Sequence, residues 1–159
     1  FNLATNARLF VGLASRDLSV SDPQLIQGAK VGRWVRDNTP TDSFFYQWGV
    51  EWETYFVAER RSPTRQLNAL LMVMFGVAVE NGAPMAAEFD RIQKEIIAGL
   101  EAHPPEIVAV TASVKNYDMR SFYLPAYVDN MLRTKYDLLF EEKPYWIFRR
   151  KGSTQQSVP

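Results

Sequence analysis

The sequence predicts an α/β fold: a three-layer sandwich with a mostly parallel sheet and a C-terminal antiparallel edge hairpin. Two observations carry this prediction. Helix-like and strand-like segments alternate along the chain, the order that gives parallel strands with helices packed on them. The last two apolar segments are joined only by Lys143-Pro144, which predicts a hairpin. With 159 residues, 47% of them hydrophobic, the chain suits one domain around one core.

The expected domain covers residues 21–151, between a membrane-proximal lead-in at 1–20 and a flexible polar tail at 152–159. Its first helix starts at Pro23, because the preceding Ser-Asp pair offers a capping side chain and proline suits the first helical turn. The helix ends before Pro40, since proline disfavours helical geometry in the residue ahead of it.

Later elements follow from hydrophobic spacing. The expected order is a strand at 43–50, a short helix at 51–59, a turn and short strand at 60–67, an apolar segment at 68–84 that could be a buried helix, a helix at 85–100, a strand at 106–112, a helix at 121–136 and strands at 136–142 and 145–150. Three helices carry apolar stripes. The stripes are Leu25, Ala29, Gly32 and Val35, packed on the sheet; Met85, Phe89, Ile92, Ile96 and Leu100; and Leu124, Val128 and Met131. In the short helix, Trp52, Tyr55 and Phe56 should share one side.

Composition excludes several classes of function. The 18 basic and 18 acidic residues give zero net charge, so we expect no nucleic-acid partner. With no cysteine and one histidine, His103, neither a thiolate site nor a multi-histidine metal site can form. We read His103 as a helix-ending cap. No glycine-rich phosphate loop is present, so we expect no nucleotide cofactor. The most apolar run, 69–79, is far shorter than the roughly 20 residues that span a bilayer.

The richest source of chemistry is the segment WGVEWETYFVAERRSPTR, residues 48–65, which we call the 48–65 segment. Glu51 and Glu53 follow the carboxyl end of a predicted strand, where α/β sheets place ligands. Beside Trp48, they could contact a sugar, act in acid–base catalysis, or simply cap a helix and face solvent. The arginines could grip a phosphate, neutralise Glu53 and Glu59, or lie on lipid headgroups. The candidate recognition residues are Trp48, Glu51, Glu53, Tyr55, Arg60, Arg61 and Arg65.

Five sequence blocks carry a family resemblance. They are VGRWVRDNTPTDS at 31–43, FYQWGVEWETYFVAERRSPTR at 45–65, HPPEIVAV at 103–110, YDLLF at 136–140 and YWIFRR at 145–150. Their order resembles the C-terminal soluble region of polytopic membrane glycosyltransferases, the superfamily of polyprenyl-phosphate-mannose protein mannosyltransferases and aminoarabinose transferases. The resemblance covers roughly residues 23–150. The apolar stretch 68–84 has no counterpart in it.

The resemblance implies an extracytoplasmic α/β domain that follows a multi-span membrane part. In such families the catalytic acid lies near the first membrane helices, so no residue of this chain inherits that role. The domain would help receive the acceptor or stabilise the membrane part, its partners being that part and a lipid-linked sugar donor or acceptor. The chain opens with Phe1, and we expect it to be a piece of a longer protein.

A second hypothesis stays open beside the resemblance. The chain could be a free-standing small α/β enzyme or polar-ligand-binding protein. Its pocket would then lie at the carboxyl ends of strands 43–50 and 106–112, with Glu51 and Glu53 contacting the ligand.

Overall fold

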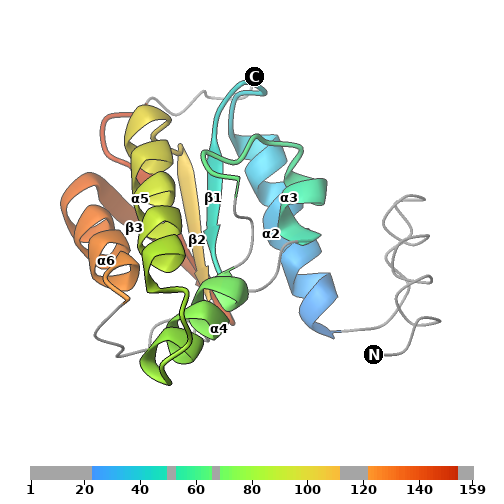
Figure 1. The fold of residues 1–159 in the computed structure, drawn as a ribbon. Coiled ribbons are helices and arrows are strands. Elements are labelled where there is room, and N and C mark those ends of the chain that lie inside the picture. The colour runs from blue at the N-terminus through green and yellow to red at the C-terminus, as the bar shows by residue number, and fades with distance from the viewer. Residues whose placement is uncertain (1–22, 50–52, 66–68, 112–121, 154–159) are drawn as a thin grey trace.

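The computed structural model describes residues 23–49, 53–65, 69–111 and 122–153 (Figure 1). The elements are α2 (Pro23–Asn38), β1 (Phe45–Trp48), α3 (Glu53–Ala58), α4 (Ala69–Glu80), α5 (Ala86–Ala102), β2 (Ile107–Thr111), α6 (Leu124–Lys135), β3 (Tyr136–Glu142) and β4 (Tyr145–Arg150). The mixed α/β character is therefore confirmed. The predicted lead-in at 1–20 and most of the predicted tail lie outside the described residues.

The four described strands form one mixed sheet in the order β1-β2-β4-β3. Only β1 and β2 pair in parallel, while β2–β4 and β4–β3 are antiparallel. The prediction of a mostly parallel sheet is thus not confirmed. The C-terminal hairpin was predicted correctly, but its second strand lies against β2 inside the sheet and leaves β3 at the edge. The short strand expected after Arg60 is a single bridge between Phe44 and Arg61.

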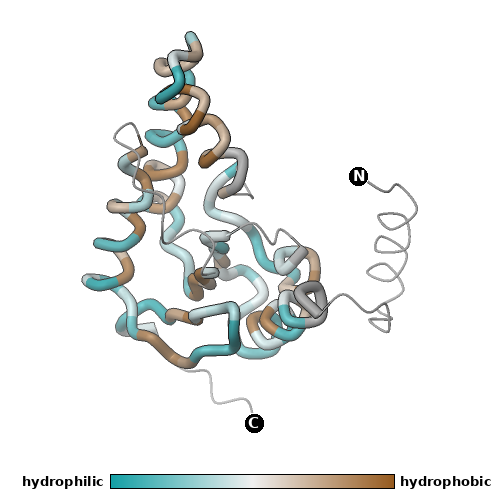
Figure 2. Tube along the Cα trace, turned by 90° about the horizontal axis from the view of Figure 1, so that it is seen from below, coloured by the Kyte–Doolittle hydropathy of each residue, from teal (hydrophilic) through white to brown (hydrophobic). Residues whose placement is uncertain are grey.

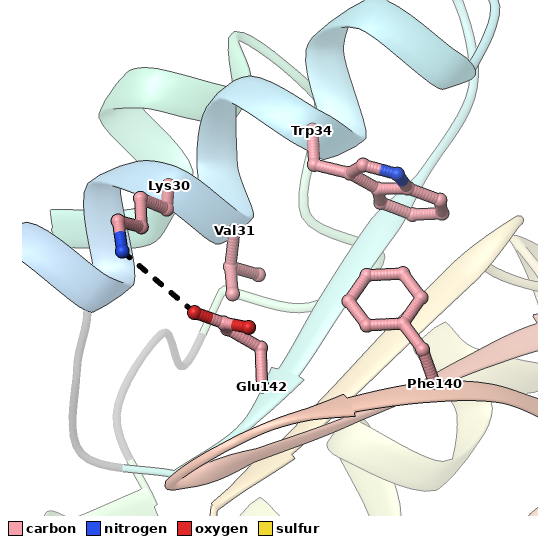
Figure 3. Close-up of a pocket in the computed structure, with 5 residues that line it drawn as sticks. All are labelled: Lys30, Val31, Trp34, Phe140 and Glu142. Carbon is pink, nitrogen blue, oxygen red and sulfur yellow. Dashed lines mark ion pairs between the residues drawn. The ribbon is translucent and has the colours of Figure 1, made fainter.

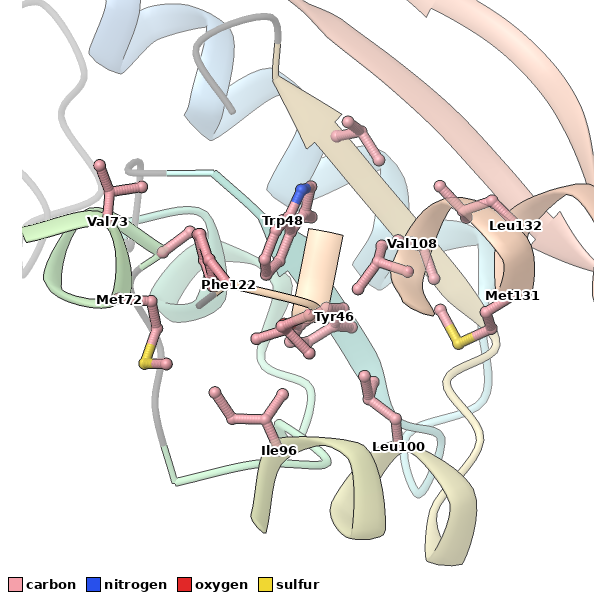
Figure 4. Packing of buried hydrophobic residues seen from close by; sticks show 14 of the residues in the cluster. Tyr46, Trp48, Met72, Val73, Ile96, Leu100, Val108, Phe122, Met131 and Leu132 are labelled. Atoms are coloured by element: carbon pink, nitrogen blue, oxygen red, sulfur yellow. The ribbon is translucent and has the colours of Figure 1, made fainter. Parts of the chain in front are cut away.

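Helices lie on both faces of this sheet, α2 and α3 on one side and α5 and α6 on the other (Figure 1). Alternate residues of each strand point to opposite faces, so the central strands feed two hydrophobic clusters. Phe45 and Ile107 belong to the cluster under α2 and α3, whereas Tyr46 and Val108 belong to the larger one, shown in Figure 4. Burying each such side chain contributes about 1.5–3 kcal/mol.

The helices on the larger cluster follow their predicted stripes, except that Met85 precedes α5 and is only partly buried. In α5 the buried residues include Phe89, Ile92, Ile96 and Leu100, and in α6 they include Leu124, Val128 and Met131. The stripe did not reveal Gln93, which is buried and whose Oε1 accepts the Leu124 N–H at 3.1 Å. This bond ties the start of α6 to the middle of α5.

The other helix pair corrects two expectations. Gly32 faces α3 rather than the sheet: a Cβ at this position would lie 2.8 Å from the Thr54 carbonyl oxygen and 2.8 Å from the Val57 Cβ. In α3, Tyr55 is buried but Phe56 is 58% exposed, so these two do not share a side as predicted, and Trp52 lies outside the described residues. Adjacent helical residues are rotated by about 100° and cannot both face a narrow contact.

Candidate functional site

The buried arginine of the 48–65 segment joins that segment to α2. The Arg60 Nε donates to the Thr39 Oγ1 at 2.9 Å, and its Nη2 donates to the carbonyls of Arg36 and Thr39, both at 2.6 Å. Its Nη1 donates to the carbonyls of Ala58 and Glu59 at 3.2 Å. A guanidinium has five N–H donors, and all five are used here. Arg60 in this arrangement has no donor left for a phosphate.

The last carbonyls of a helix have no hydrogen-bond partners within the helix. At the C-terminal end of α2, Arg60 and two nearby side chains supply these partners. Besides the Arg36 carbonyl, the Val35 carbonyl accepts from the Thr39 hydroxyl at 2.6 Å, and the Trp34 carbonyl accepts from Asn38 at 2.9 Å. Burial lowers the pKa of Arg60, opposed by the charge of Glu59. We assign Arg60 a structural role as a clamp between the helix end and the segment after α3.

Two aromatic residues of the segment also belong to the interior. Trp48 is buried in the larger cluster, with its ring centroid 6.3 Å from that of Phe122. The Tyr55 hydroxyl accepts the Gln47 backbone N–H at 2.8 Å, and burial raises the pKa of Tyr55 to about 12. Both side chains hold β1 in place, and neither presents a stacking surface to solvent.

The remaining candidates divide between the surface and the undescribed part of the chain. Arg61 is exposed, with its guanidinium 4.8 Å from the Phe44 ring centroid and a hydrogen bond to the Asp42 carbonyl at 2.9 Å. Arg65 is exposed. Glu53 is the first residue of α3, but its side chain, like the whole of Glu51, lies outside the described residues. The structure therefore separates Arg60, inside, from Arg61 and Arg65, outside.

His103 follows the last residue of α5, as predicted for a helix-ending position. Its backbone N–H donates to the Gly99 carbonyl at 2.9 Å, which continues the helical pattern by one bond. Its ring stacks on Phe44 with centroids 4.7 Å apart. The Phe44 ring thus contacts both His103 and Arg61.

Helix α4 brings an apolar face to the surface. Met72 and Val73 are buried in the larger cluster, whereas Met74 is 59% and Val77 46% exposed. No charged residue occurs between Arg65 and Glu80. Figure 2 shows the resulting run of hydrophobic residues along α4. We call Met74, Val77 and the partly exposed Phe75 and Ala78 the α4 face. A helix whose outer side is apolar as well is typical of a surface that packs against another protein or a membrane.

The α4 face lies at the end of the molecule where the chain enters α2 and where β1 ends (Figure 1). The Ala69 N–H that starts α4 donates to the Gly49 carbonyl at 2.9 Å, directly after β1. Because β1 and β2 are parallel, both carboxyl ends point to this end of the sheet. We call it the α4 end.

A pocket between α2 and the edge strand β3 was not predicted. It has a volume of about 260 Å³ and is lined by Lys30, Val31, Trp34, Phe140 and Glu142 (Figure 3). Its residues come from segments about a hundred positions apart, and the sequence holds no motif that links them. Only the place of the hairpin in the sheet brings β3 against α2.

No known protein family, curated protein or solved structure matches the chain. Within the ranges that the structure describes, no helix is long and apolar enough to cross a membrane. The same ranges contain no group of three or more His, Asp or Glu side chains placed to hold a metal ion.

Proposed function

We propose that this chain is the soluble, non-catalytic extracytoplasmic domain of an integral-membrane glycosyltransferase that uses a polyprenyl-phosphate-linked sugar. In this proposal the three-layer α/β domain docks on its own membrane part through the α4 face and helps receive the acceptor. The observation that carries it is the exposed apolar face of α4 at the end where the chain enters α2. A membrane part that precedes the domain would approach from that end.

The bonds of Arg60 support the non-catalytic part of the proposal. They connect two of the sequence blocks on which the family resemblance depends, W-x-R-x-N-T-P-x-D at 34–42 and the E-R-R of residues 59–61. Three residues of these blocks, Arg36, Thr39 and Arg60, meet in a hydrogen-bonded joint. These hydrogen bonds stabilise the fold and use all five donors of Arg60. Recognition of the acceptor falls to Glu51, Glu53, Arg61 and Arg65.

The test uses the full-length protein encoded by the native reading frame. Met74→Glu with Val77→Glu places two charges on the α4 face, and we expect transfer of sugar by isolated membranes to fall at least about tenfold, because burying unpaired charges in an interface is costly. The matched control is Leu138→Glu with Leu139→Glu, which places the same two charges on exposed apolar residues of the edge strand β3. Thermal melting of the isolated domain checks that both variants remain folded.

Two outcomes would contradict the proposal. One is a native protein that fractionates as soluble and has no hydrophobic spans before Phe1. The other is full transfer activity in the α4 double variant, which would remove the α4 face from the docking surface.

A second function has one observation in its favour. The parallel register of β1 and β2, from Phe45 opposite Ile107 to Trp48 opposite Val110, places two carboxyl strand ends side by side. Ligands of α/β proteins bind at such ends. A free-standing ligand-binding protein would use Glu51 or Glu53 there. Loss of binding in Glu51→Gln or Glu53→Gln would favour this function, and unchanged binding in both would exclude that pocket.

A further inference from the structure

The pocket between α2 and β3 combines an aromatic wall with a pair of opposite charges. Trp34 and Phe140 meet edge to face, with ring centroids 4.8 Å apart and planes at 75°. At the other side, Lys30 Nζ lies 3.8 Å from Glu142 Oε1, and both side chains are about half exposed. Figure 3 shows the rings and the ion pair facing one space, with Val31 between them.

The ion pair is weak enough to exchange partners. At 3.8 Å it lies near the outer limit of an ion pair, and exposed pairs of this kind contribute only about 0–1 kcal/mol. The Lys30 ammonium and Glu142 carboxylate therefore remain available as one donor and one acceptor group for a ligand. Their charges cancel, so the pocket favours a neutral ligand over an ion.

The pocket also lies toward the α4 end. Glu142 stands opposite Tyr145 in the sheet, and Tyr145 stands opposite Thr111, the last residue of β2. The Lys30–Glu142 side of the pocket therefore lies at the same height along the strands as the carboxyl end of β2. Arg149 lies on Trp34 from the sheet side, with its guanidinium carbon 5.8 Å from the ring centroid and a hydrogen bond to the Asn38 carbonyl at 3.2 Å. This contact helps to fix the orientation of the indole.

We propose that this pocket binds a single neutral pyranose ring. A pyranose has an apolar C–H face that packs on an aromatic side chain and a rim of hydroxyls that hydrogen-bond to a carboxylate and an ammonium. The volume of about 260 Å³ falls below the roughly 300 Å³ at which pockets for drug-sized ligands begin, so it suits one ring rather than a chain of sugars. A sugar site here would extend the proposed function. The site depends on that function only for where the sugar comes from, a lipid-linked donor or an acceptor.

The test titrates the chain with methyl glycosides of common hexoses and follows the binding by two-dimensional amide NMR. The indole N–H signal of Trp34, assigned with the Trp34→Phe variant, should shift together with the amides of Lys30 and Glu142. We expect a dissociation constant on the order of 1 mM, as suits a small open pocket. Glu142→Gln should weaken binding about tenfold, because it removes a charged hydrogen-bond acceptor. The matched control, Glu141→Gln, changes the neighbouring exposed residue of β3 and should leave binding unchanged.

A second titration, with a hexose 1-phosphate, distinguishes an acceptor sugar from a lipid-phosphate-linked donor as the source of the sugar. Equal or weaker binding than for the methyl glycoside supports this site with the neutral acceptor sugar as the source, whereas tighter binding would contradict the preference of the pocket for a neutral ligand. Absence of any shift at Trp34 with every glycoside would overturn the proposal, as would shifts confined to residues near Trp48 and Thr111. A membrane-bound parent protein whose domain shows no such shifts would refute the sugar site while leaving the proposed function intact.

Discussion

Arg60 illustrates how a single buried side chain can connect two segments of a fold. Its guanidinium donates five hydrogen bonds, one to the Thr39 hydroxyl and four to backbone carbonyls. Two of these carbonyls, those of Arg36 and Thr39, lie at the end of α2. The negative end of the helix dipole favours a cation at this place. The charge is thus stabilised by oriented dipoles rather than by one carboxylate. Burial nevertheless lowers the pKa of Arg60, which remains a cation at any physiological pH.

Arg60→Met keeps a long side chain but removes all five hydrogen bonds. We expect the free energy of unfolding to fall by about 2–4 kcal/mol, because buried carbonyls lose their partners. Urea unfolding followed by circular dichroism measures the change. Arg61→Met is the control, since this exposed side chain makes one solvent-exposed hydrogen bond, to the Asp42 carbonyl, and a cation–π contact of about 0.5–1 kcal/mol. Equal losses in the two variants would contradict the clamp.

Tyr55 gives the fold a dependence on alkaline pH. Its pKa is raised from 10.0 to about 12 in the folded chain, chiefly by burial, so the folded state holds the proton more tightly than the unfolded state. The associated stability is complete below pH 10 and is lost as the pH rises toward 12. Burial raises the pKa values of Tyr46 and Tyr136 as well, and these act in the same direction.

Tyr55→Phe removes one of these groups. We expect it to lower stability at neutral pH by about 1–3 kcal/mol, because the Gln47 N–H loses its acceptor. Above pH 10, however, its stability should fall less steeply than that of the unmodified chain. Urea midpoints measured at several pH values on both sides of pH 10 test both statements. Parallel curves for the two proteins would show that Tyr55 does not contribute to the alkaline loss.

At the scale of elements, the contact between α2 and α3 depends on the missing side chain of Gly32. Gly32→Ala would place a methyl group 2.8 Å from both the Thr54 carbonyl oxygen and the Val57 Cβ, which forces the helices apart. We expect a loss of about 1–3 kcal/mol despite the better helix propensity of alanine. Arg33→Ala, at the next, exposed position of α2, should change stability by less than about 0.5 kcal/mol. Thermal melting distinguishes the two, and a neutral Gly32→Ala would refute the close contact.

The elements themselves could be predicted from local signals. Pro23 and Pro40 bracket α2, and the stripe from Phe89 to Leu100 defines α5, because these features act within a few residues. Sheet order depends on contacts between distant segments. Nothing in Tyr145–Arg150 itself states that this strand lies beside β2, so the parallel sheet was expected where a mixed one forms.

The same distinction explains the outcome for the candidate site. Sequence patterns drew attention to the 48–65 segment because it is rich in charged and aromatic residues. They could not tell that Arg60 and Tyr55 turn inward, since that depends on α2 and β1 lying beside them. The pocket at Lys30 and Glu142 escaped notice because its residues lie on α2 and β3, which meet only in the assembled sheet.

At the scale of the whole molecule, we expect net charge and the α4 face to act together on self-association. The chain carries zero net charge at pH 7 and has an isoelectric point near 6.8. Electrostatic repulsion between copies is therefore weakest near neutral pH, where the apolar α4 face remains exposed. We expect the isolated domain to self-associate most strongly close to pH 6.8 and less at pH values well above or below it.

Met74→Glu with Val77→Glu should reduce this association for two reasons. The double variant removes the most exposed part of the α4 face, and it lowers the net charge at pH 7 from 0 to −2. Static light scattering across the pH range measures the effect. Leu138→Glu with Leu139→Glu gives the same charge change on β3, so it separates the two causes. Lower scattering in the α4 variant alone would identify the α4 face as the associating surface, and equal reduction in both variants would attribute the association to net charge.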